Sequence, residues 1–237
     1  MLLLLTNDDG IDAPGLRALE TAAASWGEVI VVAPAQVRSG YSHRTTTLES
    51  LEIKECGPNR YSCSGTPVDC VRVAMAHMNV KPDCVLSGVN HGANLGIDIY
   101  MSGTTAAARE AALHGITAFA LSQYHKPSST IDWQLTSDGC RQLFSDYGHK
   151  PLNHGEFWNV NFPDQHEPSA WTREMPAATM EVNPDPSPLA LSYRMESAGL
   201  QYQCDYHGRP RMAGLDVETC FNGSISVSKI SLFQPCS

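Results

Sequence analysis

The chain has 237 residues, of which 42% are hydrophobic, and its 16 Lys and Arg against 25 Asp and Glu give a formal net charge of -9. This length suits one α/β domain with a substantial buried core. The acidic balance and the lack of a long Lys/Arg cluster argue against binding to nucleic acid, and no apolar run is long enough to cross a membrane. We therefore expect a single domain with an appendage, and a partner that is neither nucleic acid nor membrane.

The first apolar run, Leu2–Thr6, contains four consecutive leucines. No basic segment precedes it and no small-residue cleavage site follows it, so the run predicts a buried parallel strand rather than a secretion signal. The eight cysteines form no CxxC pair, which favours reduced thiols in the core over a disulfide framework. These features predict a cytoplasmic protein.

Three further short apolar runs follow within the first 125 residues, at 29–33, 83–86 and 116–121. Between the runs, apolar residues recur at three- and four-residue spacing in two helical segments, which are marked by Leu16, Leu19 and Ala23 and by Val68, Val71, Met75 and Met78. Alternating strands and helices predict an α/β fold with a doubly wound, mostly parallel sheet, that is, a Rossmann-like three-layer sandwich.

Helix-end signals accompany these segments. Thr66 supplies a hydroxyl cap and Asp69 an acid three residues later, which is the capping-box pattern. Asp12 precedes a proline in a similar position and predicts a second cap. Gly27 and Gly115 follow their helices where a left-handed terminating residue is expected.

The second half of the chain is rich in proline and polar residues and has weak periodicity. We expect a strand at 157–162, then an extended segment that reaches a partner subunit, and a strand-like stretch at 223–232. Residues 1–125 would form the core α/β unit of the single domain 1–237, and residues from about 164 onward an extended arm and C-terminal segment.

Two adjacent acids, Asp8 and Asp9, come directly after the first predicted strand. Ligands of open parallel sheets bind beyond the carboxyl ends of the strands, where a dinucleotide-binding protein would place GxGxxG. Two carboxylates in a partly desolvated crevice repel a phosphate unless a cation lies between them. The alternative is that the acids only cap a turn, as Asp-Gly sequences often do; a pair directly after a buried strand favours the metal site.

Oxygen donors also occur in the next two loops at this edge of the predicted sheet. Ser39 follows the second strand and Asn90 the third. Together with Asp8 and Asp9 they suit a hard divalent cation such as Mg²⁺, Mn²⁺ or Ca²⁺ rather than zinc.

Another candidate binding feature is the stretch Ser102-Gly103-Thr104, which begins an Ala-rich helix. Its free amides and the positive end of the helix dipole would favour an anion such as phosphate. An ordinary Ser/Thr helix cap is the alternative interpretation. Six other side chains are candidates for proton transfer or base stacking, and nothing in their spacing selects one: His43, His91, His114, Tyr41, Tyr100 and Tyr124.

Several stretches in the first 163 residues together resemble the survival protein E (SurE) nucleotidases: "TNDDG" with "APGL", "VVAP" followed by "RSG", "SGTPVDCV", "SGVNHGANLG", "SGTTAAAREA" and "NVNFP". The resemblance implies phosphatases that act on nucleoside 5'- and 3'-monophosphates, some also on short polyphosphate, with one divalent cation per subunit, Mg²⁺ or Mn²⁺. The expected metal ligands are Asp8, Asp9, Ser39 and Asn90. The expected substrate-binding residues are Gly40, Ser102, Gly103 and Thr104.

The family also implies homodimers or homotetramers that exchange C-terminal segments. The chain departs from the family pattern at Met101, where an aromatic residue or histidine is usual, and in its ending "GSISVSKISL". These departures affect substrate preference and the details of subunit exchange.

The expected mechanism is in-line attack of water on a phosphate bound at the cation, with Asp8 and Asp9 as the catalytic residues. One alternative is a covalent phospho-aspartate, although enzymes of that type use Asp-x-Asp and here the acids are adjacent. Another is a non-catalytic, receiver-like regulatory domain that binds metal and phosphate. That fold needs a phosphoacceptor Asp at the end of a later strand, and the stretch "VLSG" at 85–88 offers none.

Overall fold

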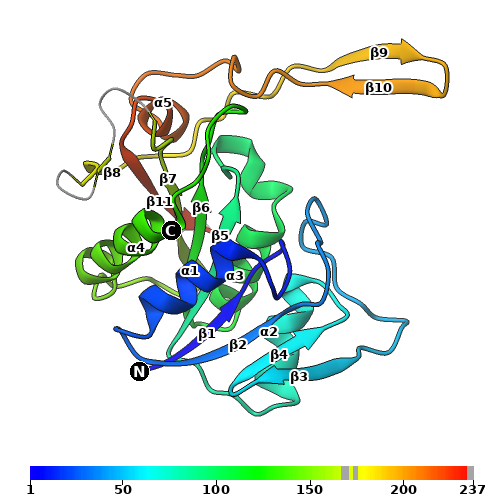
Figure 1. The fold of residues 1–237 in the computed structure, drawn as a ribbon, viewed down its shortest axis with the longest axis vertical. Helices are drawn as coiled ribbons and strands as arrows, with labels where there is room; N and C mark the ends of the chain where they lie inside the picture. The colour runs from blue at the N-terminus through cyan, green and yellow to red at the C-terminus, as the bar shows by residue number, and fades with distance from the viewer. Residues whose placement is uncertain (167–170, 173–175, 234–237) are drawn as a thin grey trace.

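The computed structural model describes residues 1–166, 171–172 and 176–233, and its centre is a nine-stranded sheet (Figure 1). The strand order across the sheet is β3 (Ile53–Gly57), β4 (Arg60–Cys63), β2 (Glu28–Pro34), β1 (Leu2–Thr6), β5 (Cys84–His91), β6 (Thr117–Gln123), β7 (Glu156–Phe162), β11 (Ile225–Ser231) and β8 (Thr179–Glu181). The six strands from β4 to β7 pair in parallel, whereas β3 and β11 run antiparallel to their neighbours β4 and β7. The mostly parallel sheet confirms the predicted fold class.

Helices cover both faces of the sheet. α1 (Pro14–Ala23) packs beside α4 (Trp133–Tyr147) on one face, and α2 (Pro67–Ala76) beside α3 (Gly103–Leu113) on the other (Figure 1). The leucine run of β1 serves both layers, because alternate side chains of a strand point to opposite faces. Leu3 and Leu5 lie in the core under α1 and α4, and Leu4 lies in the core under α2 and α3. None of the helices in the described residues is long and apolar enough to cross a membrane.

The four strands predicted in the first half of the chain are confirmed as β1, β2, β5 and β6, and those predicted at 157–162 and 223–232 as β7 and β11. Sequence analysis missed the β3–β4 hairpin, α4 and several shorter elements. The shorter ones are the 3₁₀ helix η1 (Gly96–Tyr100), β8, the hairpin of β9 (Ser192–Glu196) with β10 (Gly199–Gln203), and α5 (Asp216–Phe221).

The helix-end predictions are confirmed at two of four places. Thr66 caps α2 in a complete capping box with Asp69, and Gly115 follows α3 with φ +73°. The prediction that Asp12 caps a helix was wrong. Ala13 occupies the N-cap of α1, and the exposed Asp12 carboxylate forms an ion pair with Arg17. The prediction that Gly27 adopts a left-handed conformation was wrong. Glycine is required there because a Cβ would lie 2.4 Å from the carbonyl oxygen of Met1.

The C-terminal part of the chain divides into a packed portion and a projecting one. β11 is an inner strand between β7 and β8, and α5 packs against it. The β9–β10 hairpin forms a separate two-stranded sheet that extends away from the rest of the chain (Figure 1). Its long apolar side chains are exposed, among them Tyr193, Met195, Leu200 and Tyr202.

The cysteines agree with the expectation of core thiols. All seven described cysteines are free, and five of them are buried: Cys63, Cys70, Cys84, Cys140 and Cys220. Cys56 and Cys204 are exposed, and the eighth, Cys236, lies outside the described residues.

Candidate functional site

Asp8 and Asp9 lie at the carboxyl end of β1, and each is held by a different neighbouring segment. Asp8 is buried, and its Oδ1 accepts a 2.5 Å hydrogen bond from the Thr104 hydroxyl in the first turn of α3. Asp9 is half-buried, and its Oδ2 accepts a 2.9 Å hydrogen bond from the backbone N–H of His91 at the end of β5. The two acids therefore join β1 to the two segments that carry the other predicted site residues.

The turn that carries the acids is closed by a different residue. Asn7 accepts from the N–H of Gly10 at 3.2 Å and donates to its carbonyl oxygen at 2.9 Å, while Gly10 adopts φ +102°. The carboxylates of Asp8 and Asp9 thus do not close their own turn, contrary to the capping alternative. A further main-chain hydrogen bond, from Arg38 to the Asp8 carbonyl oxygen at 2.7 Å, fixes the loop after β2 beside them.

Burial dominates the electrostatics of the two acids. Burial, reinforced by the charge of Asp9, raises the pKa of Asp8 to about 6 against the opposing hydrogen bond from Thr104. Burial also raises the pKa of Asp9. Among the described residues no Lys, Arg or His side chain forms an ion pair with either carboxylate. A hard divalent cation is the partner that two unpaired carboxylates fit.

A cavity of ≈ 270 Å³ opens at this place, and five predicted site residues line it: Asp8, Ser39, Gly40, Asn90 and Ser102. The Asn90 amide nitrogen donates to the Gly92 carbonyl oxygen at 2.8 Å, which leaves the amide oxygen as the group available to a cation.

The other predicted residues adjoin the same cavity through Asp8 and His91. Thr104 hydrogen-bonds Asp8, and Asp9 accepts from the N–H of His91, which also lines the cavity. Gly103 packs so closely that a Cβ there would lie 2.9 Å from both Cβ and Oδ2 of Asp8. The structure therefore brings all eight predicted site residues together.

At the start of α3, the Ser102-Gly103-Thr104 stretch both caps the helix and presents free backbone N–H groups that could bind an anion. Ser102 is an ordinary N-cap, because its hydroxyl oxygen accepts from the N–H of Thr105 at 3.1 Å. The N–H groups of Gly103 and Thr104 belong to the first helical turn, which has no intrahelical acceptors. Since that turn lies against Asp8, its positive end faces the cavity where the charge of the acids would otherwise be uncompensated.

A buried amide network fixes the loop that follows β5. Asn161 accepts from the N–H of Asn94 at 2.8 Å and donates to its carbonyl oxygen at 3.1 Å, and Asn159 donates to the same oxygen at 2.9 Å. The Asn94 side chain itself donates to Ser122 at 2.8 Å. The "NVNFP" stretch on β7 thus positions the segment that carries Asn90, four residues before Asn94.

Sequence reasoning missed a third acid at the cavity, Asp98 of η1. It is buried and accepts 2.7 Å hydrogen bonds from the Arg209 guanidinium and from the Tyr206 hydroxyl. Because Arg209 compensates its charge, Asp98 ties the C-terminal segment to the rim of the site. Its basic partner is 111 residues away, so no local pattern indicated the pair.

Of the three histidine candidates, only His91 lines the cavity. His43 and His114 instead contact opposite oxygens of the buried Glu110, at 2.9 and 3.2 Å. Although burial raises the pKa of Glu110, hydrogen bonds from His43 and Arg72 outweigh it and lower the pKa to about 2. The ring of His91 lies 4.4 Å from that of His125, centroid to centroid.

The three tyrosines occupy different environments. Tyr124 is buried and stacks on Phe221, so it belongs to the core. Tyr100 is exposed on η1, and Tyr41 is exposed in the loop after β2. Neither of these two lines the cavity at Asp8.

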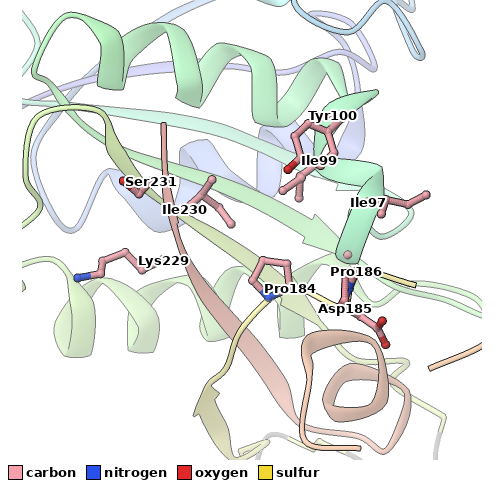
Figure 2. Close-up of a pocket in the computed structure, with 10 residues that line it drawn as sticks. Ile97, Ile99, Tyr100, Pro184, Asp185, Pro186, Lys229, Ile230 and Ser231 are labelled. Carbon is pink, nitrogen blue, oxygen red and sulfur yellow. The ribbon is translucent and has the colours of Figure 1, made fainter. Parts of the chain in front are cut away.

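A second cavity, of ≈ 310 Å³, lies between η1, residues 184–186 and residues 229–231 (Figure 2). Figure 2 shows Ile99 and Tyr100 on one side and Ile230 on the other. The acid at its wall, Asp185, already accepts hydrogen bonds from two backbone N–H groups. The second cavity has no pair of uncompensated charges and none of the predicted site residues.

Comparison with known proteins identifies the family to which the chain is similar. The model of the family described as survival protein SurE matches residues 3–181. A protein of Nostoc sp. (strain PCC 7120) is 40% identical over 230 residues, which is 97% of this chain and 99% of that protein. The 5'-nucleotidase SurE of Allorhizobium ampelinum is 38% identical, over 98% of this chain and 92% of its own length. The crystal structure of the SurE protein from Aquifex aeolicus has a TM-score of 0.82 at 29% identity, covering 98% of this chain and 94% of that one.

Proposed function

The chain belongs to the survival protein SurE family, and from this premise we propose that it is a phosphomonoesterase that releases phosphate from nucleoside 5'-monophosphates, and from 3'-monophosphates. The relatives named 5'-nucleotidase support the substrate class. The observation that carries the proposal is the adjacent pair of buried Asp8 and half-buried Asp9. Neither forms an ion pair with a basic side chain in the described ranges, and Asp8 lies against the first turn of α3.

One divalent cation per subunit, Mg²⁺ or Mn²⁺, fits the donor set. Asp8, Asp9, Ser39 and Asn90 would hold it through oxygen atoms, the ligands that these cations prefer. When bound, the cation supplies Lewis-acid stabilisation of charge on the phosphate.

The residues of the chain have distinct parts in the reaction. The N–H groups of Gly103 and Thr104, with Ser102 and Gly40, bind the non-bridging phosphate oxygens at the positive end of α3. The Thr104 hydroxyl holds Asp8 in place at 2.5 Å. The scissile phosphate is thereby oriented for in-line attack by water.

Direct attack by water is favoured over a phospho-aspartate. The Asp8 carboxylate is buried and already accepts from Thr104, and Asp9 accepts from the His91 N–H. Each of these hydrogen bonds uses one oxygen of its carboxylate, and the proposed cation would take the other, so neither acid would keep an oxygen free to approach phosphorus. We therefore expect no covalent phosphoenzyme to be trapped by acid quenching.

We also propose a homodimer or homotetramer in which C-terminal segments exchange. An isolated two-stranded hairpin is marginally stable in water, yet the β9–β10 hairpin extends alone with Tyr193, Met195, Leu200 and Tyr202 exposed. A second copy of the chain would cover these side chains. Light scattering should show an oligomer, and Leu200→Glu should shift it toward smaller species.

The free buried cysteines support a reducing, cytoplasmic location. Fractionation of cells that produce the chain tests this proposal. Recovery of the protein from an oxidising compartment, with its core thiols paired, would contradict it.

The activity is tested by phosphate release from a panel of nucleoside 5'- and 3'-monophosphates, with added Mn²⁺ or Mg²⁺ and with a chelator. Asp9→Asn should lower the rate by at least about 100-fold. Asp12→Asn is a matched control, because Asp12 is an exposed acid three residues away that contacts only Arg17. Chelator-resistant turnover, or a wild-type rate in Asp9→Asn, would remove the basis of the proposed function.

A further inference from the structure

Two arginines converge on one tyrosine beside the candidate site. The guanidinium carbons of Arg38 and Arg44 lie 5.6 and 5.7 Å from the ring centroid of Tyr41. All three residues belong to the loop that follows β2. The aromatic ring attracts each cation, but it does not neutralise their mutual repulsion.

These arginines differ from most of the arginines that the structure describes because neither forms an ion pair with an acid. Six arginines form ion pairs with carboxylates: Arg17, Arg60, Arg72, Arg141, Arg194 and Arg209. Within the ranges that the structure describes, neither Arg38 nor Arg44 does so. Arg38 donates one N–H to the Ser64 carbonyl oxygen at 2.7 Å, and its Nε is buried without a hydrogen-bond partner. In a chain with a net charge of -9, two uncompensated cations in one place point to an anionic ligand.

The two side chains line a small polar cavity of ≈ 110 Å³. Ser50, Thr46 and the exposed Glu49 also line it, and the Thr46 hydroxyl donates a 2.7 Å hydrogen bond to the buried Asp69 carboxylate. Arginine guanidinium groups match the oxygens of a phosphate with several parallel N–H donors. The composition of the cavity therefore suits a phosphate group better than an apolar or cationic one.

Residues of one loop line both this arginine cavity and the cavity at Asp8. Arg38 lines the arginine cavity, while the next residue, Ser39, lines the cavity of the predicted metal ligands. The backbone N–H of Arg38 also donates to the Asp8 carbonyl oxygen at 2.7 Å. A ligand with two phosphate groups could thus place one in each cavity.

We propose that Arg38, Tyr41 and Arg44 form a subsite for a second phosphate group on the nucleotide substrate. The inference rests on the proposed function, because it takes the site at Asp8 to bind the phosphate that is cleaved. It predicts that nucleotides with two phosphates, such as a nucleoside 3',5'-bisphosphate, are better substrates than the corresponding monophosphates.

Arg44→Gln is the informative substitution. Within the described part of the chain the Arg44 guanidinium contacts the Tyr41 ring and forms no hydrogen bond or ion pair, whereas Arg38 also donates a hydrogen bond to the Ser64 carbonyl oxygen. Phosphate release is compared for AMP, adenosine 3',5'-bisphosphate and ADP at saturating Mn²⁺. ADP carries its second phosphate next to the first, and the bisphosphate carries it across the ribose. Loss of one charge-assisted contact should lower kcat/KM for at least one of these two about tenfold relative to AMP.

The controls separate this inference from the function itself. Arg141→Gln removes a surface arginine on α4 and should change no ratio. Arg44→Lys, which keeps the charge without the planar fork, should give an intermediate ratio, and thermal unfolding shows whether each variant is folded. If Arg44→Gln is folded and leaves both ratios unchanged while wild-type enzyme cleaves AMP, the subsite is refuted and the proposed function stands. If wild-type enzyme does not cleave AMP, the proposed function fails first.

Discussion

Replacing Asp8 by Asn should make the metal-free protein more stable while it abolishes activity. Asn keeps the shape of the side chain and an oxygen that can accept from Thr104, and it removes the buried charge. The wild-type carboxylate has a pKa of about 6 in the folded protein against 3.8 for its ordinary value. Between pH 3.8 and about 6 the folded state binds more protons at Asp8 than the unfolded state does. The free energy of unfolding of the wild-type protein therefore falls as the pH rises through this range.

The size of the effect follows from the two pKa values. At pH 7 the shift costs the wild-type folded state about 3 kcal/mol, and at pH 5 about half as much. The neutral Asn side chain bears no such cost at either pH. The stability difference between Asp8→Asn and wild type should therefore grow by about 1 kcal/mol from pH 5 to pH 7.

Urea unfolding in the presence of a chelator, at pH 5 and pH 7, measures this difference directly. A second series with Mn²⁺ should stabilise the wild-type protein and leave Asp8→Asn unchanged, because a ligand stabilises only the state that binds it. A difference that does not change with pH would show that Asp8 is not the buried, uncompensated acid described above. Equal stabilisation of both proteins by Mn²⁺ would show that Asp8 does not hold the cation.

Three further predictions concern the same site. The apparent Kd for Mn²⁺, measured by calorimetry, should rise about tenfold per pH unit as the pH falls below about 6, since a proton then competes for Asp8; a flat profile would contradict this. Gly103→Ala should lower kcat/KM at least about tenfold and cost about 1–3 kcal/mol in urea unfolding, because the new Cβ would lie 2.9 Å from Asp8. Asn161→Ala should cost about 1–3 kcal/mol, because it leaves the buried N–H of Asn94 without an acceptor, while the Asn94 carbonyl oxygen keeps its hydrogen bond from Asn159; an unchanged unfolding midpoint would refute the positioning role.

The parallel strands of the core were predictable because strands that are buried on both faces consist of consecutive apolar residues. A strand that is covered on both sides needs apolar residues at successive positions, and Leu2–Thr6 shows this directly. The capping box at Thr66 was equally readable, since its two contacts are local. Local signals failed where a tertiary contact decides the outcome, as at Gly27, which is set by the close approach of Met1.

α4 was overlooked although its sequence held a signal. Asp132 caps its first turn, and Leu135, Leu143 and Phe144 recur at helical spacing toward the core. The intervening polar residues and Gly139 hide this pattern, and the close packing of Trp171 on that glycine is visible only in three dimensions. The β3–β4 hairpin likewise had a turn signal in "GPN" at 57–59.

The predicted site residues lie together because a parallel sheet delivers the ends of its strands to one edge. Asp8 and Ser39 follow β1 and β2, and Asn90 lies near the carboxyl end of β5, which extends to His91 rather than ending near residue 86 as predicted. These strands are neighbours in the order β2-β1-β5, so knowing the fold class was enough to bring the three residues to one edge. The same logic could not find Asp98 or Arg44. The first depends on a partner 111 residues away, and the second on the course of an irregular loop.

The arrangement around Asp8 explains why the fold tolerates an unfavourable charge at its centre. Asn7 and Gly10 fix the turn, Thr104 fixes the carboxylate, and the first turn of α3 presents its positive end to it. These contacts orient the acid before any ligand arrives, and they only partly offset its burial, since the pKa of Asp8 remains raised. A residual cost of this kind is largest for the empty site and is removed by a bound cation. Cation affinity and instability of the metal-free protein should therefore rise and fall together among variants of the residues that surround Asp8.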